Sequence, residues 1–133
     1  MKFNTKIRYG LRVMIEIALQ NDENGIFQKD IAKKQSLSTK YLDHIIAPLK
    51  AAELIQNSGG KRSGYILTKP PEEITTLDIF KAFDPIFVSL DCLCDDESCD
   101  RSSSCSAQKF WDDLNNSMIE HLNSVTLYEL SVN

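Results

Sequence analysis

Four cysteines gather in one short segment of the chain. They are all the cysteines among its 133 residues, and they fall within fourteen positions, with the spacing Cys92-x-Cys94-x₄-Cys99-x₅-Cys105. A disulfide framework would distribute cysteines along a secreted chain, whereas a tight cluster is typical of a metal-binding or redox-active site. Iron–sulfur clusters and zinc both use cysteine thiolates, and this spacing alone does not separate them, although the C-x₂-C pairs of zinc ribbons are absent.

The charged residues are unevenly distributed. Residues 1–70 hold 12 Lys and Arg against 6 Asp and Glu, a net charge of +6, whereas residues 71–133 hold 3 against 13, a net charge of −10. The basic part indicates an anionic partner, for which nucleic acid is the common case. A mixed, solvated surface is the alternative explanation of the same charges.

Two groups of residues in the basic part are candidates for contact with DNA. The first group falls at the start of a predicted helix and consists of Ser38, Thr39, Lys40, Tyr41, Asp43 and His44, which we expect to be exposed. Thr39, Lys40 and Tyr41 can reach phosphates or base edges. Asp43 would repel phosphate, so if it points into the groove we expect it to accept a hydrogen bond from a cytosine amino group or to exclude wrong bases. His44 could donate to a phosphate or be merely solvated.

The second group consists of Lys61 and Arg62, which stand in a glycine-rich tip. A cation there could enter a narrow minor groove, and a solvated turn is the alternative. Lys29, Lys33 and Lys34 are expected to contribute only attraction for phosphates.

The elements that position the first group form a predicted helix-turn-helix. Apolar residues at helical spacing predict a short helix over residues 28–35 and another from 39 to 52, with Ser38 or Thr39 as the cap of the second. We expect this helix to continue past Pro48, because the apolar spacing does. In such a motif the second helix enters the major groove of DNA.

Further elements flank the motif. An amphipathic helix is predicted over residues 5–20 with Thr5 as its N-cap, and a β-hairpin follows the motif around the 59–64 tip. A short helix over 77–83, capped by a threonine at 75 or 76, comes next. Helix-turn-helix followed by a hairpin is a winged helix-turn-helix.

The acidic part contains the cysteine segment and one long predicted helix. Residues 89–106 show no periodicity and are expected to form a loop, and a helix over 107–123 follows. We interpret its narrow apolar stripe as a dimer-forming surface, with packing on the chain's own core as the alternative. The stripe consists of Trp111, Leu114, Met118, Leu122 and Val125.

The predicted fold is mainly α with a small β-hairpin. We expect a winged helix-turn-helix over residues 1–85, a cysteine-bearing loop over 86–106 and a dimerisation helix with a tail over 107–133, all within one structural domain. No apolar run is long enough for a membrane helix and no signal peptide is evident, so a cytoplasmic location without membrane contact is expected.

Taken as a whole, the chain resembles the Rrf2 family of bacterial winged-helix transcription regulators, which includes iron–sulfur cluster regulators and nitric-oxide sensors. The resemblance covers nearly the whole chain. It is carried by the cysteine loop together with RYGLR at 8–12, STKYL at 38–42, GYIL at 64–67, KPPEEIT at 69–75 and TLYEL at 126–130.

The resemblance implies a homodimer that binds a palindromic operator in double-stranded DNA. It also implies that three loop cysteines hold an iron–sulfur cluster, of the 2Fe–2S or 4Fe–4S type. Cys99 and Cys105 match the second and third family cysteines. Cys94 is the preferred match for the first, and Cys92 is the alternative first ligand or a fourth one.

The chain departs from the family pattern at three positions. Gln108 stands where cluster-assembly regulators have a histidine, Arg8 stands where some nitric-oxide sensors have an acidic residue, and Gly59 stands where the family has an arginine at the wing. The fourth ligand and the operator sequence are therefore not assigned.

These features favour a DNA-binding regulator, and a repressor in particular, whose operator affinity depends on a cluster that senses redox state, nitric oxide or cluster supply. A cluster-free thiol-redox regulator is one alternative. A zinc-stabilised winged-helix module for protein contacts is another. An enzyme is not indicated, since no glycine-rich phosphate loop and no nucleophile with an adjacent base are evident.

Overall fold

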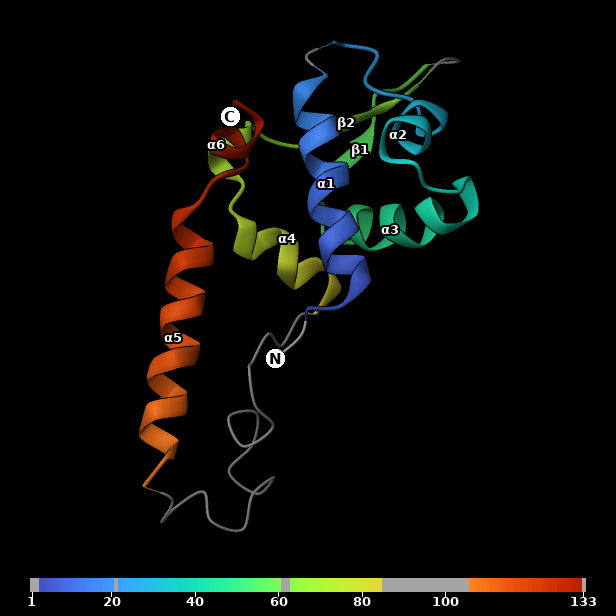
Figure 1. Cartoon of the computed structure of the whole chain (residues 1–133). Helices are drawn as coiled ribbons and strands as arrows, with labels where there is room; N and C mark the ends of the chain where they lie inside the picture. Colours follow the sequence, from blue (N-terminus) through green and yellow to red (C-terminus); the bar gives the residue numbers. More distant parts are fainter. Residues whose placement is uncertain (1–2, 21, 61–62, 85–105, 133) are drawn as a thin grey trace.

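The computed structural model describes residues 3–20, 22–60, 63–84 and 106–132. Figure 1 shows a helical body with a two-stranded hairpin at one end and a long helix along one side. The elements in chain order are α1 (Thr5–Leu19), α2 (Gln28–Gln35), α3 (Thr39–Ala51), β1 (Ile55–Asn57), β2 (Tyr65–Leu67), the 3₁₀ turn η1 (Pro71–Glu73), α4 (Thr76–Phe83), α5 (Gln108–Ser124) and α6 (Leu127–Ser131). The predicted fold class is confirmed.

Helix α1 forms the central support of the body. It buries one apolar face that includes Val13, Met14 and Ile17, and it packs against α2, α3, α4 and α6. The prediction of Thr5 as N-cap is wrong by one residue. Asn4 has an extended backbone and its side-chain oxygen accepts a hydrogen bond from the Ile7 amide at 2.8 Å, whereas Thr5 is already helical.

The helix-turn-helix is confirmed, with a tight turn that local chemistry explains. Ser36 ends α2 in the left-handed conformation, at φ 55°. Ser38 caps α3, and its hydroxyl accepts from the Tyr41 amide at 3.0 Å. Helix α3 continues past Pro48, as predicted, because its buried apolar residues hold it against the core.

The hairpin follows α3 directly. Strands β1 and β2 pair antiparallel, with Ile55 opposite Leu67 and Asn57 opposite Tyr65. Ile26, in the connection between α1 and α2, makes a further antiparallel bridge to Tyr65. The hairpin is therefore attached to the helix-turn-helix by backbone hydrogen bonds on its second strand.

The acidic part of the chain returns to the body at its C-terminal end. Thr75 caps α4 in a capping box with Asp78, which settles the choice between two threonines. Helix α5 packs against α4, and the Thr76 amide donates to the Val125 carbonyl at 2.9 Å. The side chain of Leu127 in α6 is fully buried. No helix among the described ranges has the length and apolar character needed to cross a lipid bilayer.

Candidate nucleic-acid interface

Helix α3 has one buried face and one exposed face. Leu42, Ile45 and Leu49 have no solvent-accessible surface, and Ile46 is also buried. The exposed face carries five of the six residues that the sequence singles out, which are Ser38, Thr39, Lys40, Asp43 and His44. The core therefore holds this helix in place while the polar side chains at its N-terminal end face the solvent.

Tyr41 differs from the expectation that it is exposed. It is half-buried, and its ring packs edge-on against Tyr9 of α1 with a centroid distance of 5.9 Å. The guanidinium of Arg12 also packs on Tyr9, 5.0 Å from the centroid of that ring. Packing against α1 therefore accounts for part of the Tyr41 side chain, and a phosphate contact by its hydroxyl stays a prediction.

The same region of α1 is connected to the end of α2. The Nε atom of Arg12 donates to the Gln35 side-chain oxygen at 2.6 Å, and Gln35 donates in turn to a carboxylate oxygen of Glu16 at 2.7 Å. Sequence periodicity could not predict these contacts, because each joins residues 19 or more positions apart. They hold the turn that precedes α3.

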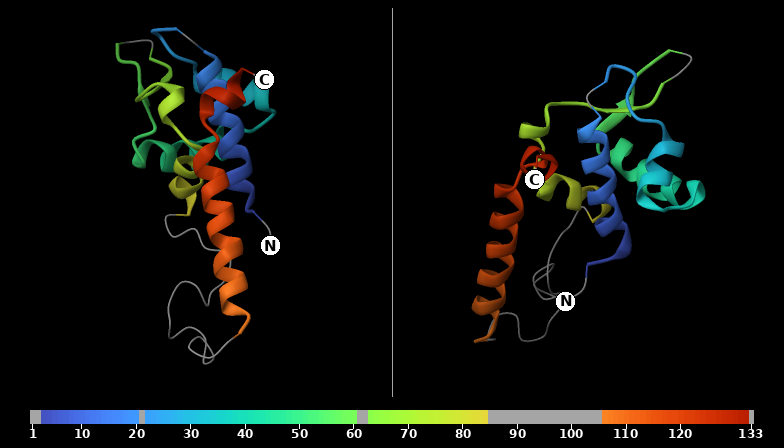
Figure 2. Two further views of the ribbon diagram at one scale, coloured as in Figure 1. Left: turned by 90° about the vertical axis from the view of Figure 1, so that its left-hand side faces the viewer. Right: turned by 45° about the horizontal axis from the view of Figure 1, so that its top comes forward.

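The β1–β2 hairpin lies on the same side of the body as the N-terminal end of α3 and away from α5 (Figures 1 and 2). The Ser58 amide donates to the Gly64 carbonyl at 2.9 Å, and the Ser58 hydroxyl donates to the Asn24 carbonyl at 2.9 Å. Gly59 and Gly60 both have positive φ, at 94° and 82°, which glycine adopts readily. Lys61 and Arg62 lie outside the described residues.

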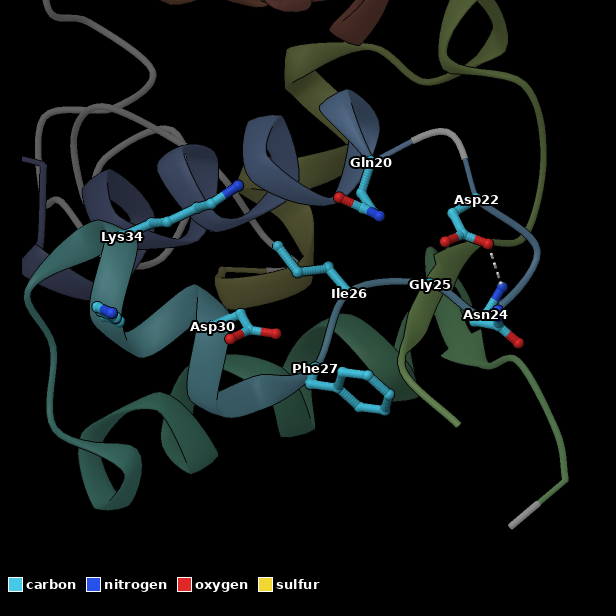
Figure 3. Close-up of a pocket in the computed structure, with 9 residues that line it drawn as sticks. Gln20, Asp22, Asn24, Gly25, Ile26, Phe27, Asp30 and Lys34 are labelled. Atoms are coloured by element: carbon cyan, nitrogen blue, oxygen red, sulfur yellow. Dashed lines mark hydrogen bonds between the residues drawn. The ribbon is translucent and has the colours of Figure 1, made fainter. Parts of the chain in front are cut away.

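The lysines of α2 are not all available for phosphates. Lys29, Lys33 and Lys34 are exposed, but the Nζ atom of Lys34 lies 3.9 Å from a carboxylate oxygen of Glu16. Figure 3 shows Lys34 reaching from α2 toward α1, beside a cleft lined by Asp30 and by the connection between the two helices. Lys34 is therefore partly neutralised, and Lys29 and Lys33 are the stronger candidates for attraction to phosphates.

A polar cluster connects α2, α3 and the hairpin. The Gln28 side-chain nitrogen donates to Asp43 Oδ1 at 2.5 Å and to the Thr39 carbonyl at 3.2 Å. The Tyr65 hydroxyl donates to the Gln28 side-chain oxygen at 3.3 Å. Burial, and then the nearby negative charge of Asp43, raises the pKa of Tyr65 above its ordinary value. Sequence reasoning did not identify Gln28, since only the tertiary structure brings its partners together.

All four cysteines, Cys92, Cys94, Cys99 and Cys105, lie outside the described residues. In the ranges that the structure does describe, no three His, Cys, Asp or Glu side chains are grouped closely enough to bind a metal ion. Gln108, which stands in place of the family histidine, is the first residue of α5 and is half-buried. The cysteine segment therefore leads directly into α5.

Comparison with known proteins places this geometry in a family. The family model described as Rrf2, iron-dependent transcriptional regulator, matches residues 3–133. The chain is 34% identical to the HTH-type transcriptional regulator CymR of Bacillus subtilis over 131 residues, which cover 98% of this chain and 90% of that protein. It is 30% identical to the HTH-type transcriptional regulator IscR of Pectobacterium atrosepticum over 130 residues, which cover 98% and 79% respectively.

A solved structure agrees with these matches. The structure of CymR, named as the global cysteine regulator of B. subtilis, superimposes with a TM-score of 0.82 at 30% identity and covers 99% of this chain and 97% of that one. The relatives are regulators of transcription and not enzymes. With its exposed recognition helix and its attached hairpin, the chain belongs to the Rrf2 family of DNA-binding transcriptional regulators.

Proposed function

We propose that the chain is a homodimeric repressor that binds a palindromic DNA site and whose affinity is controlled by an iron–sulfur cluster in the 92–105 segment. The position of α5 carries this proposal. The helix begins three residues after Cys105, and its first turns extend beyond the helices on which its later part packs (Figures 1 and 2). The cysteine segment is thus adjacent in sequence to the helix whose surface a second copy would cover.

The start of α5 exposes two aromatic side chains. Phe110 is 60% exposed and Trp111 is 36% exposed, and their rings pack edge-on with centroids 4.9 Å apart. Paired, exposed aromatic rings on a projecting helix favour burial against a partner. Leu114 and Met118 continue the stripe and are only half-buried. This arrangement supports dimerisation through α5.

A dimer would present two copies of α3 to one DNA site. In helix-turn-helix dimers the two recognition helices enter the major groove about one helical turn apart. We propose that the exposed end of α3 contacts DNA with Ser38, Thr39, Lys40, Tyr41, Asp43 and His44, and that Lys61 and Arg62 of the wing contact the adjacent groove. In this scheme residues 1–85 bind DNA, residues 86–106 contain the cluster that senses the signal, and residues 107–133 form the dimer.

The chemistry of the donor set fits an iron–sulfur cluster. Three or four thiolates within fourteen residues match the ligand number of such clusters, and we propose Cys94, Cys99 and Cys105 as ligands with Cys92 as the alternative first or fourth. When bound, a cluster supplies redox-dependent charge and fixes the separation of its cysteines. We propose that the residues of this segment then set the position of α5 at the dimer interface. A local redox change that biases the arrangement of a dimer is a known kind of switch.

Anaerobic purification tests the cluster. We expect a coloured protein with visible absorption and with bound iron and sulfide, and we expect the Cys99→Ser and Cys105→Ser variants to lose both. Comparison of Cys92→Ser with Cys94→Ser identifies the first ligand. Exposure of the coloured protein to oxygen or nitric oxide, followed by measurement of DNA affinity, identifies the signal. A colourless protein without iron or sulfide would refute the cluster.

A cluster-free thiol regulator is the second candidate function. The similarity to CymR, whose solved structure is named for a cysteine regulator, favours it. It predicts that the aerobic protein forms disulfides within the 92–105 segment and that these change DNA affinity reversibly with reductant. Mass spectrometry after thiol labelling distinguishes this chemistry from cluster loss.

The dimer has a separate test. The Trp111→Glu variant places a charge in the proposed interface and is expected to shift the protein toward monomer in sedimentation velocity. Asn116 is exposed and lies on the opposite side of α5, so Asn116→Glu is the matched control and should remain dimeric. Equal sedimentation of the two variants would contradict dimerisation through this stripe.

A further inference from the structure

Gln28 uses its whole side-chain amide in contacts that join three elements. It is the first residue of α2. Its nitrogen donates to Asp43 Oδ1 and to the Thr39 carbonyl, both in α3, at 2.5 and 3.2 Å. Its oxygen accepts from the Tyr65 hydroxyl at 3.3 Å, at the start of β2. Two acceptors on the nitrogen side and one donor on the oxygen side fix the orientation of the amide.

The contact with Asp43 has a consequence for the DNA-facing surface. Asp43 is exposed, and among the described residues Gln28 is the one that donates to its carboxylate, through Oδ1. Oδ2 is therefore the oxygen that remains free to accept from a ligand. A carboxylate on a flexible side chain would have many orientations, whereas the Gln28 contact selects one of them before DNA arrives.

The contact with Tyr65 extends this control to the wing. The Tyr65 ring also lies 5.7 Å from Nζ of Lys50, and Lys50 donates to the Asn57 side chain at 3.0 Å. Lys50 belongs to α3, and Asn57 lies opposite Tyr65 in the hairpin. Side-chain contacts thus join the recognition helix to the hairpin, and Tyr65 is the residue through which Gln28 takes part in them.

We propose that Gln28 is a positioning residue for base recognition: it orients the Asp43 carboxylate toward one base pair of each half-site and couples that orientation to the wing through Tyr65. The proposal rests on the DNA-contact role assigned above to α3. A carboxylate in the major groove accepts from the exocyclic amino group of cytosine. Gln28 itself need not donate to DNA, because both hydrogens of its side-chain amide already have protein acceptors.

Selection from a randomised duplex library tests the proposal with the purified full-length protein. The wild type and the Asp43→Ala variant are compared first, and Asp43→Ala is expected to lose the preference at one base pair per half-site. Gln28→Leu, which keeps side-chain size and removes the amide, is expected to weaken preference at that same pair about tenfold and to leave the others unchanged. Tyr65→Phe should weaken it less.

Two further variants separate positioning from general structure. Gln20 follows the last residue of α1 and stands outside the cluster around Asp43, so Gln20→Leu is the matched control and should select the same sequences as the wild type. Gln28→Leu combined with Asp43→Ala should select no differently from Asp43→Ala alone, because both act through one carboxylate. If Gln28→Leu fails to fold, Gln28→Asn retains the amide on a shorter side chain that cannot reach Asp43.

The possible outcomes are distinct. If the wild type enriches no sequence, the proposed function fails and the inference fails with it. If the wild type enriches a site and Gln28→Leu enriches the same site with equal selectivity, the inference alone is overturned. A uniform loss of affinity in Gln28→Leu at every position would also overturn it, since that pattern indicates a structural role only.

Discussion

Replacing Gly64 with alanine should detach the wing from the helix-turn-helix. Gly64 lies just before β2 and crosses the connection between α1 and α2 at very short range. A Cβ atom placed on it would lie 2.7 Å from three backbone atoms, namely the carbonyl carbon of Gly25 and the nitrogen and carbonyl carbon of Ile26. Backbone atoms cannot rotate away as a side chain can, so the two segments must separate.

The expected loss of stability follows from the overpacking at Gly64 and from the backbone hydrogen bonds that the separation weakens. Overpacking of this kind costs about 1–3 kcal/mol. The clash also lies among three backbone hydrogen bonds, from Gly64 to Asn24, from Tyr65 to Ile26 and from Ile26 to Tyr65, at 2.8, 2.8 and 3.1 Å. Each contributes about 1 kcal/mol net, and partial weakening adds to the cost. We expect Gly64→Ala to lower the free energy of unfolding by about 2–4 kcal/mol.

Urea denaturation followed by circular dichroism measures this change, at one fixed protein concentration because the proposed dimer would unfold in a concentration-dependent way. Gly10→Ala is the informative comparison. Its Cβ would meet ring atoms of Phe83, which is half-buried and can shift, and alanine is the better helix former. Gly10→Ala should therefore cost less than Gly64→Ala, and Ser63→Ala should cost less than about 0.5 kcal/mol.

Either of two results would refute the steric explanation. If Gly64→Ala unfolds at the same urea concentration as the wild type, the close approach of the wing to the α1–α2 connection is not a constraint on the fold. A loss of DNA affinity without any loss of stability would also contradict it, because the steric argument acts through the folded structure.

Three other predictions test separate parts of the molecule. Lys40→Ala should weaken binding to all DNA sequences alike and reduce the slope of log K against log salt concentration by about 0.9 for each phosphate that the lysine neutralises, as measured by titration at several salt concentrations. Thr75→Ala should lower the free energy of unfolding by about 1 kcal/mol, because its hydroxyl accepts from the Asp78 amide at 3.1 Å, whereas Thr75→Ser should retain most of the stability. The raised pKa of Tyr65 means that the folded protein holds this proton more tightly than the unfolded chain. Its contribution is therefore complete below the unfolded pKa and is lost as pH rises through the folded one, so wild-type stability should fall more steeply than that of Tyr65→Phe in alkaline denaturation.

Local signals in the sequence are sufficient for the elements themselves. The bounds of α2 agree with prediction, and those of α3 differ by one residue, because apolar spacing and caps act within one or two turns of chain. The predicted N-cap of α1 is one residue too late, since Asn4 and Thr5 are both capable caps and only the backbone conformation separates them. The cysteine segment and the wing cations lie outside the described residues and stay predictions.

The contacts that shape the interface could not be predicted in this way. Tyr41 is half-buried rather than exposed because Tyr9 packs against it, and Lys34 is paired with Glu16. Gln28 carries no signal at all in the sequence, since it joins residues that are 11, 15 and 37 positions away. Contacts between residues so far apart in the chain produce no periodic pattern in the sequence.

The sequence by itself therefore determined the order of the elements, the family and the residues at the start of the recognition helix. Its charges, its helical periodicity and its cysteine spacing are all local properties, readable along the chain. Only the tertiary structure decided which of those polar residues are free, which are held, and how the wing is attached to the helix. The physical reason is that a hydrogen bond such as that between Gln28 and Asp43 depends on side chains meeting within about 3 Å after the core has packed, and packing is a property of the whole fold.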